Sequence, residues 1–158
     1  MGGSSSIGVK MINKCFLILV ITGLVCIADT AYSNPDIIDL NAISLIESSN
    51  NPRAVNAKNG GSYGIFQISP IALKDFNEEV GSKHTIKDLF REETNAHIAI
   101  WLLEVRIPQL LVAANKPVTT KNLIIGWNCG ISCLDRKELP KTTKEYLAKY
   151  RRITGEKV

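Results

Sequence analysis

An uncharged apolar run, Cys15–Ala28, limits how much of this 158-residue chain can fold as a domain. Two lysines precede the run, and the small residues Ala31 and Ser33 follow it. A positive segment, an apolar stretch of this length and a small-residue exit are typical of a secretory signal peptide. We therefore expect residues 1–33 to be leader and signal peptide, with cleavage after Ser33, and residues 34–158 to form the functional domain.

The same run predicts where the protein resides. It is shorter than the roughly 20 apolar residues that a membrane-spanning helix needs, although an uncleaved membrane anchor is an alternative. Export predicts a periplasmic or cell-envelope location, where disulfides are chemically permissible. The exported part contains two cysteines, Cys129 and Cys133, which could close a short loop or stay two thiols. Its two histidines, His84 and His97, are too few for a four-ligand zinc site, and we expect no metal and no cofactor.

Composition and charge narrow the class of protein. Hydrophobic residues make up 45% of the chain, which is typical of globular domains. The exported part, about 125 residues, suits a single domain. The net charge is +4. Most of the excess positive charge lies from Asp135 onward, where there are 8 Lys or Arg residues and 4 acidic ones. This bias is too weak to indicate binding to nucleic acid.

Apolar residues at helical spacing, with almost no strand-like alternation, predict a mostly α-helical domain. We expect a first helix that starts at Asn34-Pro35-Asp36 and ends at Ser48–Pro52. A second helical pattern covers Thr85–Ile107 and is followed by Pro108, which interrupts helices. One face of this second helix is expected to carry Ile98, Trp101, Leu102 and Val105.

Two further helices are expected in the C-terminal third of the chain. The apolar residues Leu123–Ile125 run into Gly126–Gly130, which marks the end of a short helix. Thr142 and Glu145 have the spacing of a capping box, and a last helix is expected from there to about Arg152.

Glu47 is the most informative polar residue. It lies four residues after Ile43 and seven after Leu40, and therefore shares their apolar helix face. Burial there would raise the pKa of its carboxyl group, as required of an acid that protonates a glycosidic oxygen. The alternative is a frayed helix end with Glu47 in solvent. The Asn-, Gly- and Ser-rich residues 52–69 could form a wall of a polysaccharide cleft.

A second motif matches a catalytic pattern but lacks the fold that the pattern requires. Gly60–Gly64 fits the pattern G-x-S-x-G of serine hydrolases, with Ser62 as the nucleophile. That motif works at a turn between a strand and a helix of an α/β fold, which the surrounding sequence does not predict. We therefore do not expect a serine hydrolase.

Three short segments contain Glu47, Gln67 and Asn128. In this order they resemble the signatures of family 1 lytic transglycosylases. The family has a Glu-Ser pair that ends a helix, a Gly-Leu-Met-Gln-like segment and an Ala-Tyr-Asn-Ala-Gly-like segment. Asn95 and Tyr146 also fall where the family places an Asn and a Tyr. The resemblance covers nearly all of residues 35–150. The matching segments here are Glu47-Ser48, Tyr63-Gly64-Ile65-Phe66-Gln67 and Gly126-Trp127-Asn128-Cys129-Gly130.

The resemblance implies a small lysozyme-like α-domain of the SLT type at residues 34–158. It would cleave the β-1,4 bond between N-acetylmuramic acid and N-acetylglucosamine in peptidoglycan. Glu47 would be the single acid and base, first protonating the leaving oxygen and then activating the sugar's own 6-hydroxyl to form a 1,6-anhydro ring. Further residues would bind the glycan: Ser48, Tyr63, Gln67, Asn128 and Tyr146.

The chain departs from the family pattern at two cleft positions. Trp127 stands where a Tyr is usual and Cys129 stands where a small residue is usual, which could alter the rim of the cleft. Stand-alone domains of this size resemble the secretion- and pilus-associated members. Peptidoglycan strands are therefore the expected ligand, and secretion or pilus assembly components are the candidate protein partners.

Two alternative functions follow from the same residues. A hydrolytic lysozyme would need a second carboxylate, such as Asp75 or Asp88, that faces Glu47. A catalytically idle protein that only binds peptidoglycan would have no use for an acid on a buried face.

Overall fold

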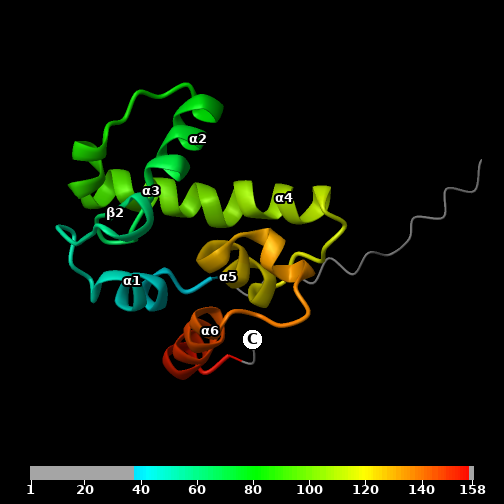
Figure 1. Cartoon of the computed structure of the whole chain (residues 1–158). Coiled ribbons are helices and arrows are strands. Elements are labelled where there is room, and N and C mark those ends of the chain that lie inside the picture. Colours follow the sequence, from blue (N-terminus) through cyan, green and yellow to red (C-terminus); the bar gives the residue numbers. More distant parts are fainter. Residues whose placement is uncertain (1–37, 157–158) are drawn as a thin grey trace, which may run out of the picture.

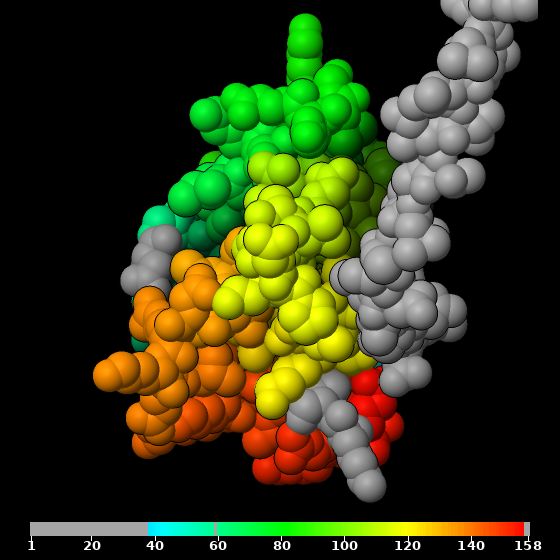
Figure 2. Space-filling model, turned by 90° about the vertical axis from the view of Figure 1, so that its right-hand side faces the viewer, coloured from blue at the N-terminus to red at the C-terminus, as the bar shows by residue number. Residues whose placement is uncertain are grey.

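A helical rod of 22 residues, Glu92–Ala113, forms the axis of the domain, and the other helices pack around it (Figure 1). The computed structural model describes residues 38–156. In Figure 1, α2 (Pro70–Val80) lies above the rod, and below it lie α5 (Thr120–Cys129), α1 (Leu40–Ser48) and α6 (Lys141–Thr154). Seen from the side in Figure 2, the α2 segment (green) is at the top, the rod's end (yellow) in the middle and α6 (red) at the bottom. The predicted mostly α-helical fold is confirmed.

The elements outside the rod are short. Two antiparallel strands of two residues each pair Val55 with Tyr63 and form the one sheet in the described part of the chain. The remaining elements are α1 (Leu40–Ser48), β1 (Val55–Asn56), η1 (Lys58–Gly60), β2 (Ser62–Tyr63), α2 (Pro70–Val80), η2 (Ile86–Phe90), α5 (Thr120–Cys129), η4 (Ile131–Asp135) and α6 (Lys141–Thr154).

Helix α1 begins later than the sequence predicted. The Asp39 side chain caps it by accepting a hydrogen bond from the Ala42 N–H at 3.0 Å, and the Asp39 N–H donates to the Tyr150 hydroxyl at 3.0 Å. Residues 38 and 39 are therefore outside the helix, because the cap is anchored on α6. The predicted start at Asn34–Asp36 and the signal peptide lie outside the described residues. The predicted end is confirmed, since Ser49 follows the helix with a φ of 56°.

The rod contains a turn of π-helix. It consists of α3 (Glu92–Trp101), the π-helical η3 (Leu102–Arg106) and α4 (Ile107–Ala113). The predicted interruption at Pro108 does not occur, and the helix continues to Ala113. Proline is tolerated here because it falls in the first turn of α4, directly after the wide turn, where its missing N–H removes no regular α-helical bond.

The π turn also changes which residues of the rod face the core. Buried residues recur every fourth position: Asn95, Ala99, Leu103, Ile107 and Leu111. The predicted face is wrong in this part, because Val105 is 41% exposed. A straight α-helix has 3.6 residues per turn and would rotate such a stripe away, whereas a wider turn restores its direction. Although the rod is long and apolar enough to span a membrane, this stripe belongs to the core of the domain.

The two predicted helix starts in the second half differ from the structure. Thr85 and Asp88 form a capping box, but it opens the short η2, and Arg91 is extended before α3 begins. The predicted box of Thr142 and Glu145 is wrong, since α6 begins at Lys141 behind Pro140 with no side-chain cap. Proline holds the chain extended there and supplies the start that the box was expected to provide.

A buried amide holds the segment between β2 and α2 in place. The Asn95 side chain accepts a hydrogen bond from the Phe66 N–H at 2.8 Å and donates to the carbonyls of Tyr63 at 2.9 Å and Leu89 at 2.8 Å. Gly64 has a φ of +77°, and a Cβ there would collide with the Leu89 carbonyl and the Asn95 amide. Only glycine fits this position, which explains the Tyr-Gly pair of the motif.

We predict that Asn95→Ala destabilises the fold by about 3 kcal/mol, because three hydrogen bonds between its side chain and backbone groups are lost and the buried Phe66 N–H loses its acceptor. Urea denaturation of the two proteins measures the difference. The matched control is Asn41→Ala, which removes a solvent-exposed amide from helix α1. A loss for Asn95→Ala no larger than that of the control would contradict the role of Asn95.

Candidate functional site

Three helices meet at one oxygen of Glu47. Its carboxyl group, in the last turn of α1, accepts hydrogen bonds at Oε1 from Trp127 Nε1 of α5 at 2.7 Å and from the Tyr146 hydroxyl of α6 at 2.9 Å. Glu47 is partly buried, so the frayed helix end with this residue in open solvent is not what the structure shows.

Burial raises the pKa of Glu47 above its ordinary value. The hydrogen bonds from Trp127 and Tyr146 and the positive charge of Lys149 oppose this shift without cancelling it. Both donors point to Oε1, and within residues 38–156 no donor reaches Oε2. The proton of the neutral acid therefore belongs on Oε2, since a proton on Oε1 would meet two N–H or O–H groups.

Tyr146 is a permanent donor. Its side chain is 6% exposed, and burial together with the adjacent Glu47 carboxylate raises the pKa of its hydroxyl far above the ordinary value. The phenol therefore stays protonated across the range in which Glu47 titrates. It stabilises the Glu47 carboxylate through a charge-assisted hydrogen bond.

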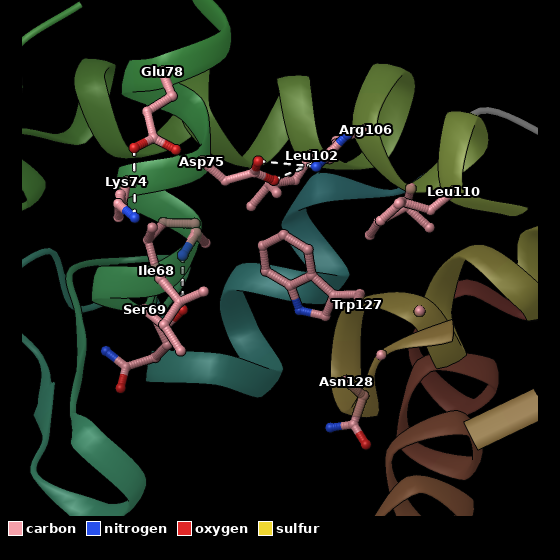
Figure 3. A pocket seen from close by; sticks show the side chains of 16 residues that line it. Ile68, Ser69, Lys74, Asp75, Glu78, Leu102, Arg106, Leu110, Trp127 and Asn128 are labelled. Atoms are coloured by element: carbon pink, nitrogen blue, oxygen red, sulfur yellow. Dashed lines mark hydrogen bonds and ion pairs between the residues drawn. The ribbon is translucent and has the colours of Figure 1, made fainter. Parts of the chain in front are cut away.

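A cleft of about 730 Å³ is lined by Trp127, one of the two donors to this carboxyl group, whereas Glu47 itself is not among the lining residues. Residues of α2 and α5 form its walls, and the π turn and α4 form its floor. Trp127 connects the two features, because it lines the cleft and its N–H reaches Glu47. In Figure 3 the Trp127 ring lies between Asn128 and the ion pair of Asp75 with Arg106.

Ser48 and Gln67, which the resemblance assigned to the substrate, are engaged within the chain. The Ser48 hydroxyl donates to the Ile65 carbonyl at 2.7 Å and joins the end of α1 to the glycine-rich segment. The Gln67 side chain lines the cleft, but its amide donates to the carbonyls of Ala54 and Gly64 and accepts from the Ser62 hydroxyl. Ser62 therefore supports Gln67, in line with the rejection of a serine hydrolase.

The other two assigned residues differ from each other. Asn128 lines the cleft, and its side chain makes no hydrogen bond within the described residues, which leaves its amide available to a ligand. Tyr63 lies in β2, and its ring packs edge-on against Phe90 with centroids 6.0 Å apart. The structure thus brings Glu47, Tyr146 and Trp127 together, and it places Asn128 beside Trp127 in the lining of the cleft.

The two candidates for a second carboxylate are both engaged. Asp75 lines the cleft but accepts two hydrogen bonds from Arg106, at 2.7 Å and 2.9 Å. Asp88 accepts from the N–H and the hydroxyl of Thr85, which lower its pKa.

Cys129 is the last residue of α5, and Cys133 lies in η4. The structure joins Cys129 and Cys133 in a disulfide, with their Cα atoms 6.2 Å apart. Within residues 38–156, no group of three His, Cys, Asp or Glu side chains could hold a metal ion. His84 and His97 both pack on the ring of Phe76.

Two residues of the site were not assigned a role from sequence. Trp127 was noted only as a departure from the family pattern, although an indole N–H next to a buried carboxylate is a donor. The sequence pattern did not identify Arg106 as a site residue, because its place in the cleft depends on the π turn.

The comparison with known families agrees with this geometry. The family model described as transglycosylase SLT domain matches residues 28–149. No curated protein and no solved structure matches the chain.

We predict that Trp127→Phe lowers kcat of the reaction that depends on Glu47 about tenfold. In the pH profile of kcat/KM, the alkaline limb should move to higher pH. The ring keeps its aromatic face, but Oε1 loses a donor that orients it and lowers the pKa of Glu47. The matched control is Lys149→Gln, which removes a pKa-lowering charge without touching the carboxyl group. It should move the limb in the same direction with kcat changed less than about twofold. Unchanged pH profiles of Trp127→Phe would contradict this coupling.

Asn128 and Gln67 are predicted to respond differently to replacement by Ala. Asn128→Ala should reduce turnover about tenfold at nearly unchanged stability, because its amide faces the cleft. Gln67→Ala should lower the free energy of unfolding by about 2 kcal/mol, because it removes three internal hydrogen bonds and leaves the Ser62 hydroxyl without its acceptor. Turnover assays and urea denaturation of both variants separate these outcomes. Equal stability losses would show that both amides are structural.

Proposed function

The chain belongs to the transglycosylase SLT domain family, whose members act on peptidoglycan, and we propose that it is a lytic transglycosylase. It cleaves the β-1,4 bond between N-acetylmuramic acid and N-acetylglucosamine and leaves 1,6-anhydro ends. The observation that carries the proposal is the position of Glu47, a carboxyl group of raised pKa held by two donors, one of which, Trp127, lines the cleft.

The proposed reaction has two proton transfers through Glu47. First, Oε2 gives its proton to the glycosidic oxygen, the bond from that oxygen to C1 of the muramic sugar breaks, and the acetamido oxygen of that sugar stabilises the cationic centre. Then the carboxylate takes the proton of the 6-hydroxyl as its oxygen bonds to C1. The hydrogen bonds from Trp127 and Tyr146 strengthen when the carboxylate forms, and therefore favour the first transfer.

The product follows from the number of available carboxylates. A hydrolytic enzyme needs a second carboxylate that activates water or stabilises the intermediate. Asp75 is held by Arg106, and Asp88 caps η2. Glu78, the other carboxylate that lines the cleft, is largely exposed and pairs with Lys74. This supports the anhydro route, which needs Glu47 alone.

The substrate implies a location outside the cytoplasmic membrane. The signal peptide expected at residues 1–33 supports export to the periplasm or cell envelope. The resemblance to secretion- and pilus-associated members supports local opening of the wall for an envelope-spanning machine.

We predict that Glu47→Gln abolishes cleavage of purified peptidoglycan without unfolding the protein. The amide still accepts from Trp127 and Tyr146, but it cannot give or take the proton. Mass spectrometry of the digest should find anhydro muropeptides, lighter by one water than reducing ones, with the parent protein only. Circular dichroism of the variant is the control for folding.

Two results would refute the proposal. Reducing ends in the parent digest, lost in Asp75→Asn, would indicate a hydrolytic lysozyme. Cleavage by Glu47→Gln at the parent's rate would exclude Glu47 from the mechanism.

A further inference from the structure

The cleft has two chemically different ends. Near Asn128 and Ser69 its lining side chains are neutral and polar, whereas the end beyond Trp127 carries charged groups from α2 and the π turn (Figure 3). Those charged groups are Lys74, Asp75, Glu78 and Arg106. Sugar hydroxyl and acetamido groups can bind either end, but only the charged end offers a cation to a charged substituent of the glycan.

Arg106 is the most constrained of these charges. Its side chain is 28% exposed, and Asp75 binds its Nε and Nη2 in a two-point contact that fixes the plane of the guanidinium group. Leu102 and Leu110, four residues to either side, line the same cleft, so the rod directs Arg106 toward the ligand. Lys74, by contrast, is 75% exposed and pairs loosely with Glu78.

The guanidinium group has donors to spare. Asp75 accepts from Nε and Nη2, which form one edge of the planar guanidinium group. Within residues 38–156, no acceptor receives a hydrogen bond from Nη1. A ligand that fills the cleft displaces the water that now solvates this edge. The ligand must then supply an acceptor, because an unpaired guanidinium N–H is costly to bury.

We propose that Arg106 binds a carboxylate of the peptide stem, and so directs the enzyme to peptide-bearing strands. The inference rests on the proposed function and adds a specificity-determining residue to it. In peptidoglycan the stem peptides carry carboxylates, and a carboxylate matches the planar fork of arginine better than a sugar hydroxyl does.

The test compares three soluble substrates made from the same strands. The first carries intact stem peptides, the second has its stem carboxylates converted to neutral methylamides, and the third has its peptides removed by an amidase. Parent protein should cleave the first with a kcat/KM about tenfold above the second. Arg106→Gln should lose about tenfold on the first substrate and change less than twofold on the other two.

Two variants separate recognition from a structural role. Asp75→Asn breaks the ion pair but keeps the Arg106 charge, and it should retain a preference for the first substrate. Arg106→Lys keeps the charge without the fork and should recover part of the preference. Melting temperatures check that all variants are folded.

Equal losses by Arg106→Gln on all three substrates, or no preference of the parent protein between the first two, would overturn the inference and leave the proposed function intact. Absence of anhydro products from every substrate with the parent protein would overturn the proposed function and this inference with it.

Discussion

The burial of Glu47 is the constraint around which helices α1, α5 and α6 are arranged. A buried carboxylate destabilises a fold unless hydrogen bonds compensate it. Here α5 supplies an indole N–H and α6 supplies a phenol, so the three helices can meet only where both donors reach Oε1. The anchor between the Asp39 N–H and Tyr150 holds α1 and α6 in the same arrangement from the other end of α1.

On the other side of the cleft, hydrogen bonds from side chains to backbone groups hold the wall in position. Asn95 holds the segment that contains Gly64 and Gln67, and Ser48 joins that segment to the end of α1 next to Glu47. Gly126 lets α5 approach the rod, because a Cβ there would collide with Ile107. The polar groups that hold this wall are internal, whereas Trp127, Asn128, Arg106 and the more exposed Lys74 and Glu78 line the cleft.

The helical class, the ends of α1 and α5 and the role of Glu47 as a buried carboxyl group could be predicted from sequence, because each depends on residues close in the chain. The π turn could not, since Pro108 is read locally as a helix breaker and the wide turn that accommodates it involves the packing of the whole rod. The start of α1 depends on Tyr150, which lies 111 residues away. The donors to Glu47 likewise come from residues 80 and 99 positions later.

Trp127 in place of the usual Tyr has a consequence for the timing of the reaction. Its ring lines the cleft while its N–H holds Glu47, so a sugar that packs on the ring also covers the acid. Covering removes water from a carboxyl group whose pKa is already raised by burial, and desolvation raises it further. Binding of the glycan would therefore keep Glu47 protonated when the substrate is in place. In the free enzyme, water and the charge of Lys149 favour the carboxylate, so the carboxyl group holds its proton most firmly when the glycan covers it.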